Sequence, residues 1–179
     1  IYGPEMVDSG HPGNHSGVSY RVTDELARSW FRRRGPRPTG SGFVSGAALL
    51  IDADSFRRLG GFDERYFLFY EDIDLCQRAN AIGVRTEIES GWRVRHAGAH
   101  STGARFGESL VWSYQSGCQF HSSRGASLRW YRSYVAIDSL VRAGVHAVRR
   151  DSGRMAAYAG LARRAASDLI RGKPVPIRP

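Results

Sequence analysis

The chain has 179 residues, 41% of them hydrophobic, which is enough for one modest domain with a buried core. The longest apolar run, residues 43–51, is too short to cross a bilayer, and the first residues lack the basic end and apolar stretch of a signal peptide. Two cysteines, Cys76 and Cys118, do not make a disulfide framework and have no metal-ligand spacing. We expect both to be small helix residues that face the interior of a protein kept in a reducing cytoplasm.

The charge of the chain is strongly positive. Lysine and arginine together number 26 against 17 acids, which gives a formal net charge of +9, and Lys173 is the only lysine. Positive charge attracts nucleic acid, anionic lipid or substrates that carry a diphosphate. The planar fork of arginine suits phosphate, although a chain rich in arginine and alanine can equally reflect a GC-rich genome. The net charge therefore favours an anionic partner, but it does not distinguish nucleic acid, anionic lipid and diphosphate substrates.

The first part of the chain contains few periodic segments. Residues 1–42 are rich in glycine, proline, histidine and serine, and within them only 23–34 is predicted to form a short helix. The aliphatic run 43–52 has the length and composition of a buried strand. Residues 54–59 favour a short helix that the Gly60–Gly61 pair stops.

The rest of the chain is predicted to be mainly helical. One helix begins at the Glu71–Asp72 pair and ends at Gly83. Two strands follow, at 84–89 and 92–96, joined by a turn at Ser90–Gly91. The remaining elements are three helices and a proline-rich tail predicted to be disordered, at 108–121, 127–150, 153–171 and 172–179.

The predicted helix at 127–150 is amphipathic and basic. Its apolar residues step by three or four, and its arginines fall mostly off that stripe, which consists of Tyr131, Tyr134, Ile137, Val141, Val145 and Val148. Two interpretations remain open for this helix and the next. They lie on an anionic membrane surface, or they pack against a sheet and leave an arginine face in water.

Acids and aromatic residues gather between residues 60 and 78, which read GGFDERYFLFYEDIDLCQR. Carboxylates beside phenylalanine and tyrosine lie in a drier setting than surface acids do. That setting raises their basicity and suits one of them to accept a proton. The alternative is that Glu71, Asp72 and Asp74 only cap the helix by binding its N–H groups.

This segment resembles the acceptor-side segment of family 2 glycosyltransferases, which are inverting enzymes of the GT-A fold. The sequence motif of that family is close to GGFDE, followed by an aromatic pair and then by ED-x-DL-x-x-R. The resemblance covers residues 43–102 most strongly, and rhamnosyltransferase-like enzymes that act on lipid-linked or cell-wall glycans are the most similar subfamily. It implies that Asp72, the aspartate of the ED pair, is the general base, with Glu71 beside it in the catalytic site.

The resemblance also implies a metal and a diphosphate site. His96 ends a predicted strand, and in the family a histidine at this place helps to hold a divalent ion, here Mg or Mn; a lone histidine is otherwise more often a packed or surface residue. Ser101 and Arg105 would supply hydrogen-bond donors to a diphosphate. The alternative for these two residues is a plain loop.

Four further residues would contact substrate. Gly46 and Ala47 are small enough to let a substrate approach the backbone, although tight packing explains them equally well. Asp63 and Glu64 would belong to the acceptor-side loop, where Asp63 either binds an acceptor hydroxyl or fixes the turn.

The resemblance implies an α/β chain with a partial GT-A, Rossmann-like fold. Residues 1–106 would be the C-terminal, acceptor-side half of the catalytic domain, 107–171 a helical extension and 172–179 a disordered tail. The donor-binding half and its DxD metal acids would lie upstream, so the isolated chain should be inactive. The implied partners are a UDP- or dTDP-sugar donor and a glycan or polyprenyl-diphosphate-linked acceptor. The implied location is the cytoplasm, including the inner face of the membrane through peripheral association.

The rival interpretation is a non-enzymatic basic module that binds nucleic acid or an anionic membrane surface. The net charge of +9 and the interleaved aromatic residues favour it. The basic residues are scattered, however, and no recognised nucleic-acid motif is present, so we expect no nucleic acid partner.

Overall fold

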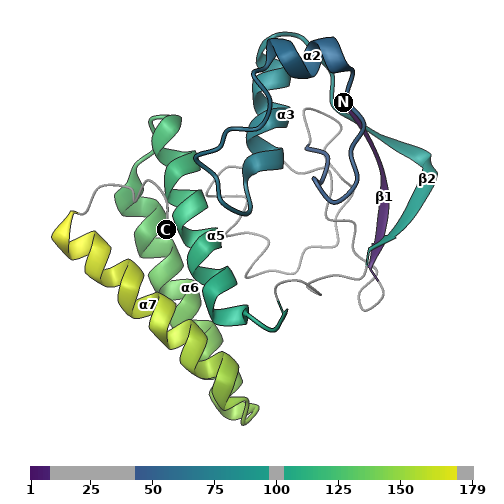
Figure 1. Ribbon diagram of the computed structural model, residues 1–179. Helices are drawn as coiled ribbons and strands as arrows, with labels where there is room; N and C mark the ends of the chain where they lie inside the picture. Colours follow the sequence, from purple (N-terminus) through teal and green to yellow (C-terminus); the bar gives the residue numbers. More distant parts are fainter. Residues whose placement is uncertain (9–42, 97–102, 173–179) are drawn as a thin grey trace. The chain divides into compact units, whose positions relative to one another are not determined.

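The computed structural model describes residues 1–8, 43–96 and 103–172 (Figure 1). The predicted helix at 23–34 and the tail beyond Gly172 lie outside these residues. The chain forms two compact units. We call residues 1–64 with 71–100 the sheet unit, and residues 65–70 with 101–179 the helical unit.

Within its described residues the sheet unit has two parallel strands, β1 (Tyr2–Asp8) and β2 (Glu87–His96), which lie side by side in Figure 1. The expectation of two strands at 84–89 and 92–96 joined by a turn was wrong. Pro4 pairs with Glu89 and the next residue, Glu5, pairs with Arg93, so residues 90–92 form a bulge within one strand. Gly91 does not have the positive φ that a tight hairpin turn requires, so the strand continues through residues 90–92 and does not reverse direction.

The predicted strand at 43–52 was also wrong. Residues 43–45 have no regular structure, and only Leu50 pairs with β1, through two hydrogen bonds of 2.8 Å with Tyr2. The segment is nevertheless buried at Phe43 and Val44. Burial, together with a hydrogen bond of 3.4 Å from the Val44 N–H to the Cys76 thiol, holds the segment in place of a strand ladder. Burial therefore explains the aliphatic run without a strand.

The two helices among the described residues of the sheet unit begin and end close to their predicted limits. α2 (Ala53–Arg58) begins after Asp52, whose carboxylate accepts the Ser55 N–H at 2.8 Å, and ends at the Gly60–Gly61 pair, where φ is +74° and +75°. α3 (Glu71–Ala81) buries Leu75, Cys76 and Ala79 on one side. These helix ends are local features, and local sequence was sufficient to place them.

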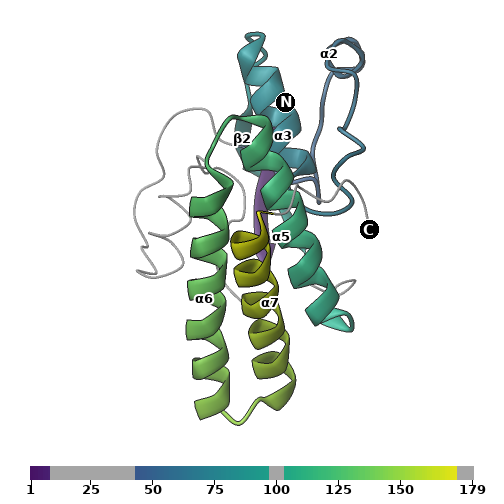
Figure 2. The ribbon, with the colours of Figure 1, turned by 90° about the vertical axis from the view of Figure 1, so that its left-hand side faces the viewer.

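The helical unit consists mainly of α5 (Phe106–Ser123), α6 (Leu128–Val148) and α7 (Ser152–Arg171), which run alongside one another in Figure 2. The three predicted helices are confirmed. Arg150, at φ +57°, lies in the turn between α6 and α7, and Asp151 caps α7 by accepting the Arg154 N–H at 3.0 Å. Among the described residues the chain is therefore mixed α and β, with helix predominating. None of the described helices combines the length and apolarity needed to cross a membrane.

The face of α6 that packs against the unit differs from the predicted stripe. Of the six stripe residues only Tyr131 is fully buried. The buried face consists instead of Tyr131, Arg132, Val135, Ala136, Ser139 and Ala143. Small side chains allow the helices to approach closely, and Arg132 reaches the Asp168 carbonyl at 3.1 Å while the Tyr114 hydroxyl donates to the Asp168 carboxylate at 3.1 Å. Periodicity identified an apolar face but could not say that the opposite face would be the buried one.

Gly117→Ala is expected to lower the free energy of unfolding by about 1–3 kcal/mol through overpacking. A Cβ at Gly117 on α5 would overlap the ring of buried Tyr131 on α6. Gly144→Ala is the matched control, because a Cβ there meets nothing within 4 Å. It should stabilise by up to about 1 kcal/mol through helix propensity. Urea unfolding followed by circular dichroism measures both changes, and shifts of the same sign would contradict the packing argument.

Candidate active site

The carboxylate of Asp72 is held at the start of α3 by two backbone groups. Its Oδ2 accepts the Gly46 N–H at 2.8 Å, and its Oδ1 accepts the Ile73 N–H at 2.8 Å. The capping interpretation is therefore met in part, since Ile73 belongs to the first turn of the helix. The contact with Gly46 goes further than capping, because it joins residues far apart in sequence and fixes the orientation of the carboxylate.

Burial raises the pKa of Asp72 above its ordinary value of 3.8, and the N–H groups of Gly46 and Ile73 oppose that increase. Burial also raises the pKa of Glu71, with a further contribution from the charge of Asp72. Within the described residues, Oε2 of Glu71 is buried and has no hydrogen-bond partner. The expected increase in basicity is thus present at both acids of the ED pair.

These raised pKa values have a cost in stability at neutral pH. The folded state holds each proton more tightly than the unfolded state does. The stabilisation from either group is therefore complete below its ordinary pKa and is lost as the pH rises through the raised value. The charged forms of Glu71 and Asp72 therefore do not stabilise the fold at neutral pH.

The surface beside Asp72 is open. Gly46 and Ala47 are both exposed. A Cβ added at Gly46 would lie 3.4 Å from the Asp72 Cβ and 3.6 Å from its Oδ2. Glycine at this position therefore leaves that side of the Asp72 carboxylate without a Cβ against it.

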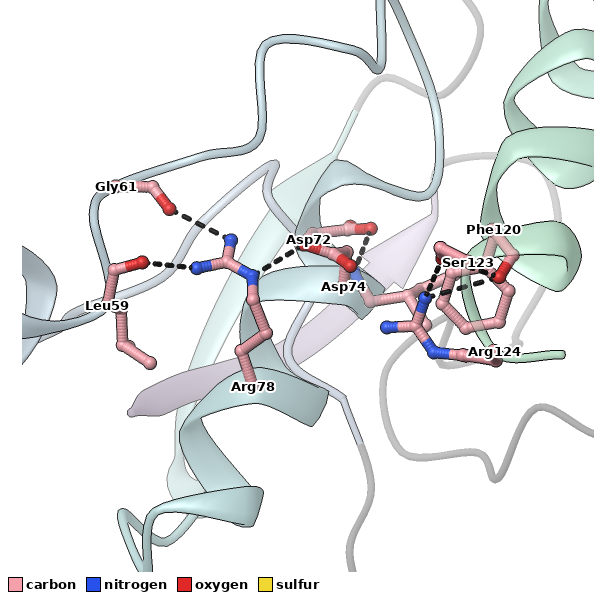
Figure 3. Close-up of polar contacts among 9 residues, drawn as sticks. Leu59, Gly61, Asp72, Asp74, Arg78, Phe120, Ser123 and Arg124 are labelled. Carbon is pink, nitrogen blue, oxygen red and sulfur yellow. Dashed lines mark hydrogen bonds and ion pairs between the residues drawn. The ribbon is translucent and has the colours of Figure 1, made fainter. Parts of the chain in front are cut away.

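Asp74 and Arg78, the other polar residues of the motif, have a structural role. Asp74 is buried and forms an ion pair of 2.7 Å with Arg78. The remaining guanidinium nitrogens donate to the carbonyls of Leu59 at 2.6 Å and Gly61 at 2.9 Å (Figure 3). One arginine thus ties the Gly60–Gly61 turn to α3. These two carbonyl contacts could not be predicted from the sequence, because they join α3 to the turn that precedes it by ten residues or more.

Residues 62–64, which were predicted to contact the acceptor, follow this turn. The Phe62 ring packs edge-on against Phe56 with centroids 5.7 Å apart. Asp63 is half-buried and Glu64 is exposed, which leaves Glu64 accessible to a ligand. Both acids also take part in other interactions of the protein.

The aromatic run that follows belongs to the helical unit. The Ser116 hydroxyl donates to the Leu68 carbonyl at 2.8 Å, and the Tyr70 ring packs on Phe120 with centroids 5.2 Å apart. Near the end of α5, the guanidinium of Arg124 lies over the Phe120 ring, 3.8 Å from its centroid, in a cation–π contact (Figure 3).

Two consecutive residues just before the ED pair have left-handed backbone. Phe69 has φ +68° and Tyr70 has φ +69°. For residues with a Cβ, such conformations cost about 1–3 kcal/mol each and concentrate at functional sites. Sequence reasoning missed them, because neither is a glycine or an asparagine, the residues that mark such turns.

The other predicted site residues are not brought to Asp72 by any described contact. His96 is the last residue of β2, as expected, and the register places Asp8, the last residue of β1, beside it. Arg105 is exposed and forms an ion pair of 3.6 Å with Glu108 while it lies 5.9 Å from the Trp112 ring centroid. Ser101 lies outside the described residues.

The described residues do not form a metal site by themselves. Nowhere among them do three or more histidine, cysteine or acidic residues gather so that they could hold an ion. Both cysteines are buried on helices, as expected, and burial raises the pKa of each thiol, which disfavours the thiolate that a metal needs.

A surface pocket of the sheet unit lies away from the ED pair. It is lined by residues at the start of β1 and around α2, together with Val84 and Arg85. Glu71 and Asp72 do not line it.

Part of the chain is similar to curated rhamnosyltransferases. Over 122 residues, 64% of this chain, it is 36% identical to N-acetylglucosaminyl-diphospho-decaprenol L-rhamnosyltransferase of Mycobacterium tuberculosis, covering 39% of that protein. This part of the chain is rhamnosyltransferase-like. Over 74 residues, 41% of the chain, it is 33% identical to rhamnosyltransferase WbbL of Escherichia coli K12, covering 28% of that protein. No family model and no solved structure matches the chain.

The rhamnosyltransferase-like chain spans well under half the length of these relatives. The resemblance to rhamnosyltransferase-like enzymes that was seen in the sequence is confirmed by these two relatives, for part of the chain. Of the residues predicted from it, the structure brings together Asp72 and Gly46, with Glu71 and Ala47 as their neighbours in the chain. That group, open on one side and raised in basicity, is the candidate active site.

Proposed function

We propose that the complete protein carrying this chain is a glycosyltransferase. It transfers rhamnose from a UDP- or dTDP-linked donor to a hydroxyl of a glycan on polyprenyl diphosphate, with inversion, and it has the GT-A fold of family 2. The observation that carries the proposal is the fixed, half-buried Asp72 carboxylate beside exposed Gly46 in a rhamnosyltransferase-like chain. A nucleotide-sugar donor implies a cytoplasmic location at the inner face of the membrane.

In this reaction Asp72 acts as the general base. The acceptor hydroxyl gives its proton to the carboxylate while its oxygen attacks the anomeric carbon. The bond from that carbon to the diphosphate oxygen breaks on the opposite face, the nucleoside diphosphate leaves, and the configuration inverts. Because the N–H groups of Gly46 and Ile73 hold the carboxylate in one orientation, it loses little conformational entropy on reaching the transition state.

The other residues would bind and orient the substrates. Asp63 and Glu64 would accept hydrogen bonds from acceptor hydroxyls, with Glu71 adding negative charge beside the base. Gly46 and Ala47 would let the acceptor reach the carboxylate. Ser101 and Arg105 would donate to the diphosphate.

A divalent ion, Mg²⁺ or Mn²⁺, remains part of the proposal as a stabiliser of the departing diphosphate. His96 would be one ligand. Since the described residues do not assemble a complete site, the other ligands would have to come from elsewhere. No step assigned to Asp72 depends on this ion.

The test is a transfer assay with the complete protein. The protein would be incubated with UDP- or dTDP-rhamnose and N-acetylglucosaminyl-diphospho-polyprenol. Mass spectrometry would measure the mass of the product, and nuclear magnetic resonance would determine its anomeric configuration. Gain of one rhamnose with inversion supports the proposal. Absence of transfer, together with salt-sensitive binding to RNA or DNA, would favour the basic binding module instead.

The acid limb of activity provides a second check. Asp72 must be deprotonated to accept a proton, so kcat/KM rises with pH through its pKa in the free enzyme. Because burial raises that pKa, half-maximal kcat/KM is expected above pH 3.8, the ordinary value for aspartate. A pH profile of kcat/KM that stays flat down to this value would contradict the assignment of Asp72 as a half-buried base.

A further inference from the structure

α6 has two faces with opposite properties. Its buried face combines the small residues Ala136, Ser139 and Ala143 with Tyr131, Arg132 and Val135. Its outer face carries large apolar residues, of which Trp130 is 73% and Val148 is 86% exposed. We call this outer face the α6 stripe; it consists of Trp130, Ile137, Leu140, Val141, Val145 and Val148. It differs from the stripe predicted from the sequence in that Trp130 and Leu140 take the place of Tyr131 and Tyr134.

The α6 stripe is continuous along the helix. Its members are spaced by three, four or seven residues, or are immediate neighbours, so they share one side. From Trp130 to Val148 the helix is about 27 Å long at a rise of about 1.5 Å per residue. Soluble proteins rarely leave an apolar surface of this extent exposed unless it binds something.

Positive charge accompanies the stripe. Arg129 precedes it and Arg149 and Arg150 follow it, and all three are exposed. Between residues 127 and 172 the only acids are three aspartates, against nine arginines. The aspartates are already engaged: Asp138 with Arg142 at 2.6 Å, Asp151 with the N-terminus of α7, and Asp168 in the buried network.

This combination fits an anionic lipid surface better than a second copy of the chain. Two copies paired along the stripe would bring Arg129 close to Arg149 or to Arg129 of the other copy, and like charges would repel. An anionic bilayer removes that repulsion. Its headgroups attract the arginines at both ends, and the apolar boundary beneath them receives aliphatic residues and a terminal tryptophan.

We propose that α6 lies flat on anionic phospholipid membranes through the α6 stripe, with Arg129, Arg149 and Arg150 at the phosphates. This proposal does not depend on the transferase function, since it is read by lipid binding alone. If both hold, membrane docking would concentrate the enzyme where a polyprenyl-linked acceptor resides.

The experiment is sedimentation of the complete protein with phosphatidylcholine vesicles, with and without phosphatidylglycerol. Wild type is expected to bind the anionic vesicles and not the neutral ones. Trp130→Gln/Val148→Gln should lower binding at least tenfold, because both side chains are mostly exposed and their loss leaves the core intact. Arg129→Gln/Arg149→Gln should lower it too, most clearly at low salt.

Ile170→Gln is the matched control, because Ile170 is 84% exposed but lies on α7, outside the stripe. It should bind like wild type, and thermal unfolding by circular dichroism should show all variants folded. Trp130 should also give a blue-shifted fluorescence component on anionic vesicles that the Trp130→Gln/Val148→Gln variant lacks.

The proposal would be overturned by absence of vesicle binding by wild type, by equal binding of the stripe variant, or by a concentration-dependent dimer that the stripe variant abolishes without any effect of lipid. The last result would assign the stripe to a second copy of the chain. Binding to RNA that competes with vesicles but leaves no lipid contact at Trp130 would also count against it.

Discussion

Asp72→Asn is expected to reduce transfer by the complete protein by about 10²- to 10⁴-fold, the usual contribution of a general base. Asparagine has nearly the same shape and can keep one of the two backbone N–H contacts, but it cannot accept a proton. Loss of a buried charge offsets the lost contact, so the free energy of unfolding should change little. The measurement is kcat/KM, with donor binding by calorimetry and thermal unfolding as controls for integrity.

Two matched variants make this result specific. Asp54→Asn changes an aspartate that is 78% exposed in the first turn of α2, and it should leave kcat/KM unchanged. Glu71→Gln tests the neighbouring acid, which is half-buried and also raised in pKa. Near-normal turnover by Asp72→Asn with a large loss in Glu71→Gln would move the base to Glu71. Near-normal turnover by both would remove the ED pair from the mechanism.

Arg78→Ala is expected to cost about 3 kcal/mol of unfolding free energy, the low end of the range for breaking a buried ion pair. The low end applies because the Arg78 side chain is 31% exposed, although Asp74 is only 6% exposed. The substitution leaves Asp74 without its arginine partner and releases the carbonyls of Leu59 and Gly61. Urea unfolding of the complete protein, followed by circular dichroism, measures the loss.

Arg57→Ala is the control for this experiment. Arg57 and Asp54 form a comparable pair within α2, but they are 73% and 78% exposed, so their loss should cost less than about 1 kcal/mol. Arg78→Lys should recover little stability, because one ammonium cannot serve three acceptors in the directions that the guanidinium fork reaches. Equal losses from Arg57→Ala and Arg78→Ala would mean that the Arg78 network is not structural.

The candidate site divides between what the sequence predicted and what it missed. The ED pair was singled out by the resemblance to family 2 glycosyltransferases, because acids after an aromatic run at a helix start are also explained by helix capping. The contact of Asp72 with the Gly46 N–H was not predicted, because 26 residues separate the two. The i,i+4 spacing of Asp74 and Arg78 is visible in the sequence, but the contacts of Arg78 with the carbonyls of Leu59 and Gly61 are not.

Errors in the fold have a common physical cause. The runs at 43–52 and 84–96 were predicted from apolar composition and a Ser–Gly pair, which report burial and local flexibility. Whether such a run becomes a strand depends on a partner to complete its hydrogen bonds. Val44 is buried against Cys76 without a ladder, whereas residues 87–96 had β1 along their length and so formed one bulged strand.

The sequence by itself determined the helix limits, the two buried cysteines and the acidic motif, because caps, glycine stops and residue order act over a few neighbouring positions. Tertiary structure alone decided which face of α6 is buried, which carboxylate is held open at Gly46, and how Arg78 joins α3 to the preceding turn. These outcomes depend on which surfaces meet. Small residues admit the closest approach between helices, so Ala136 and Ala143 became the contact and the larger apolar stripe was left outside.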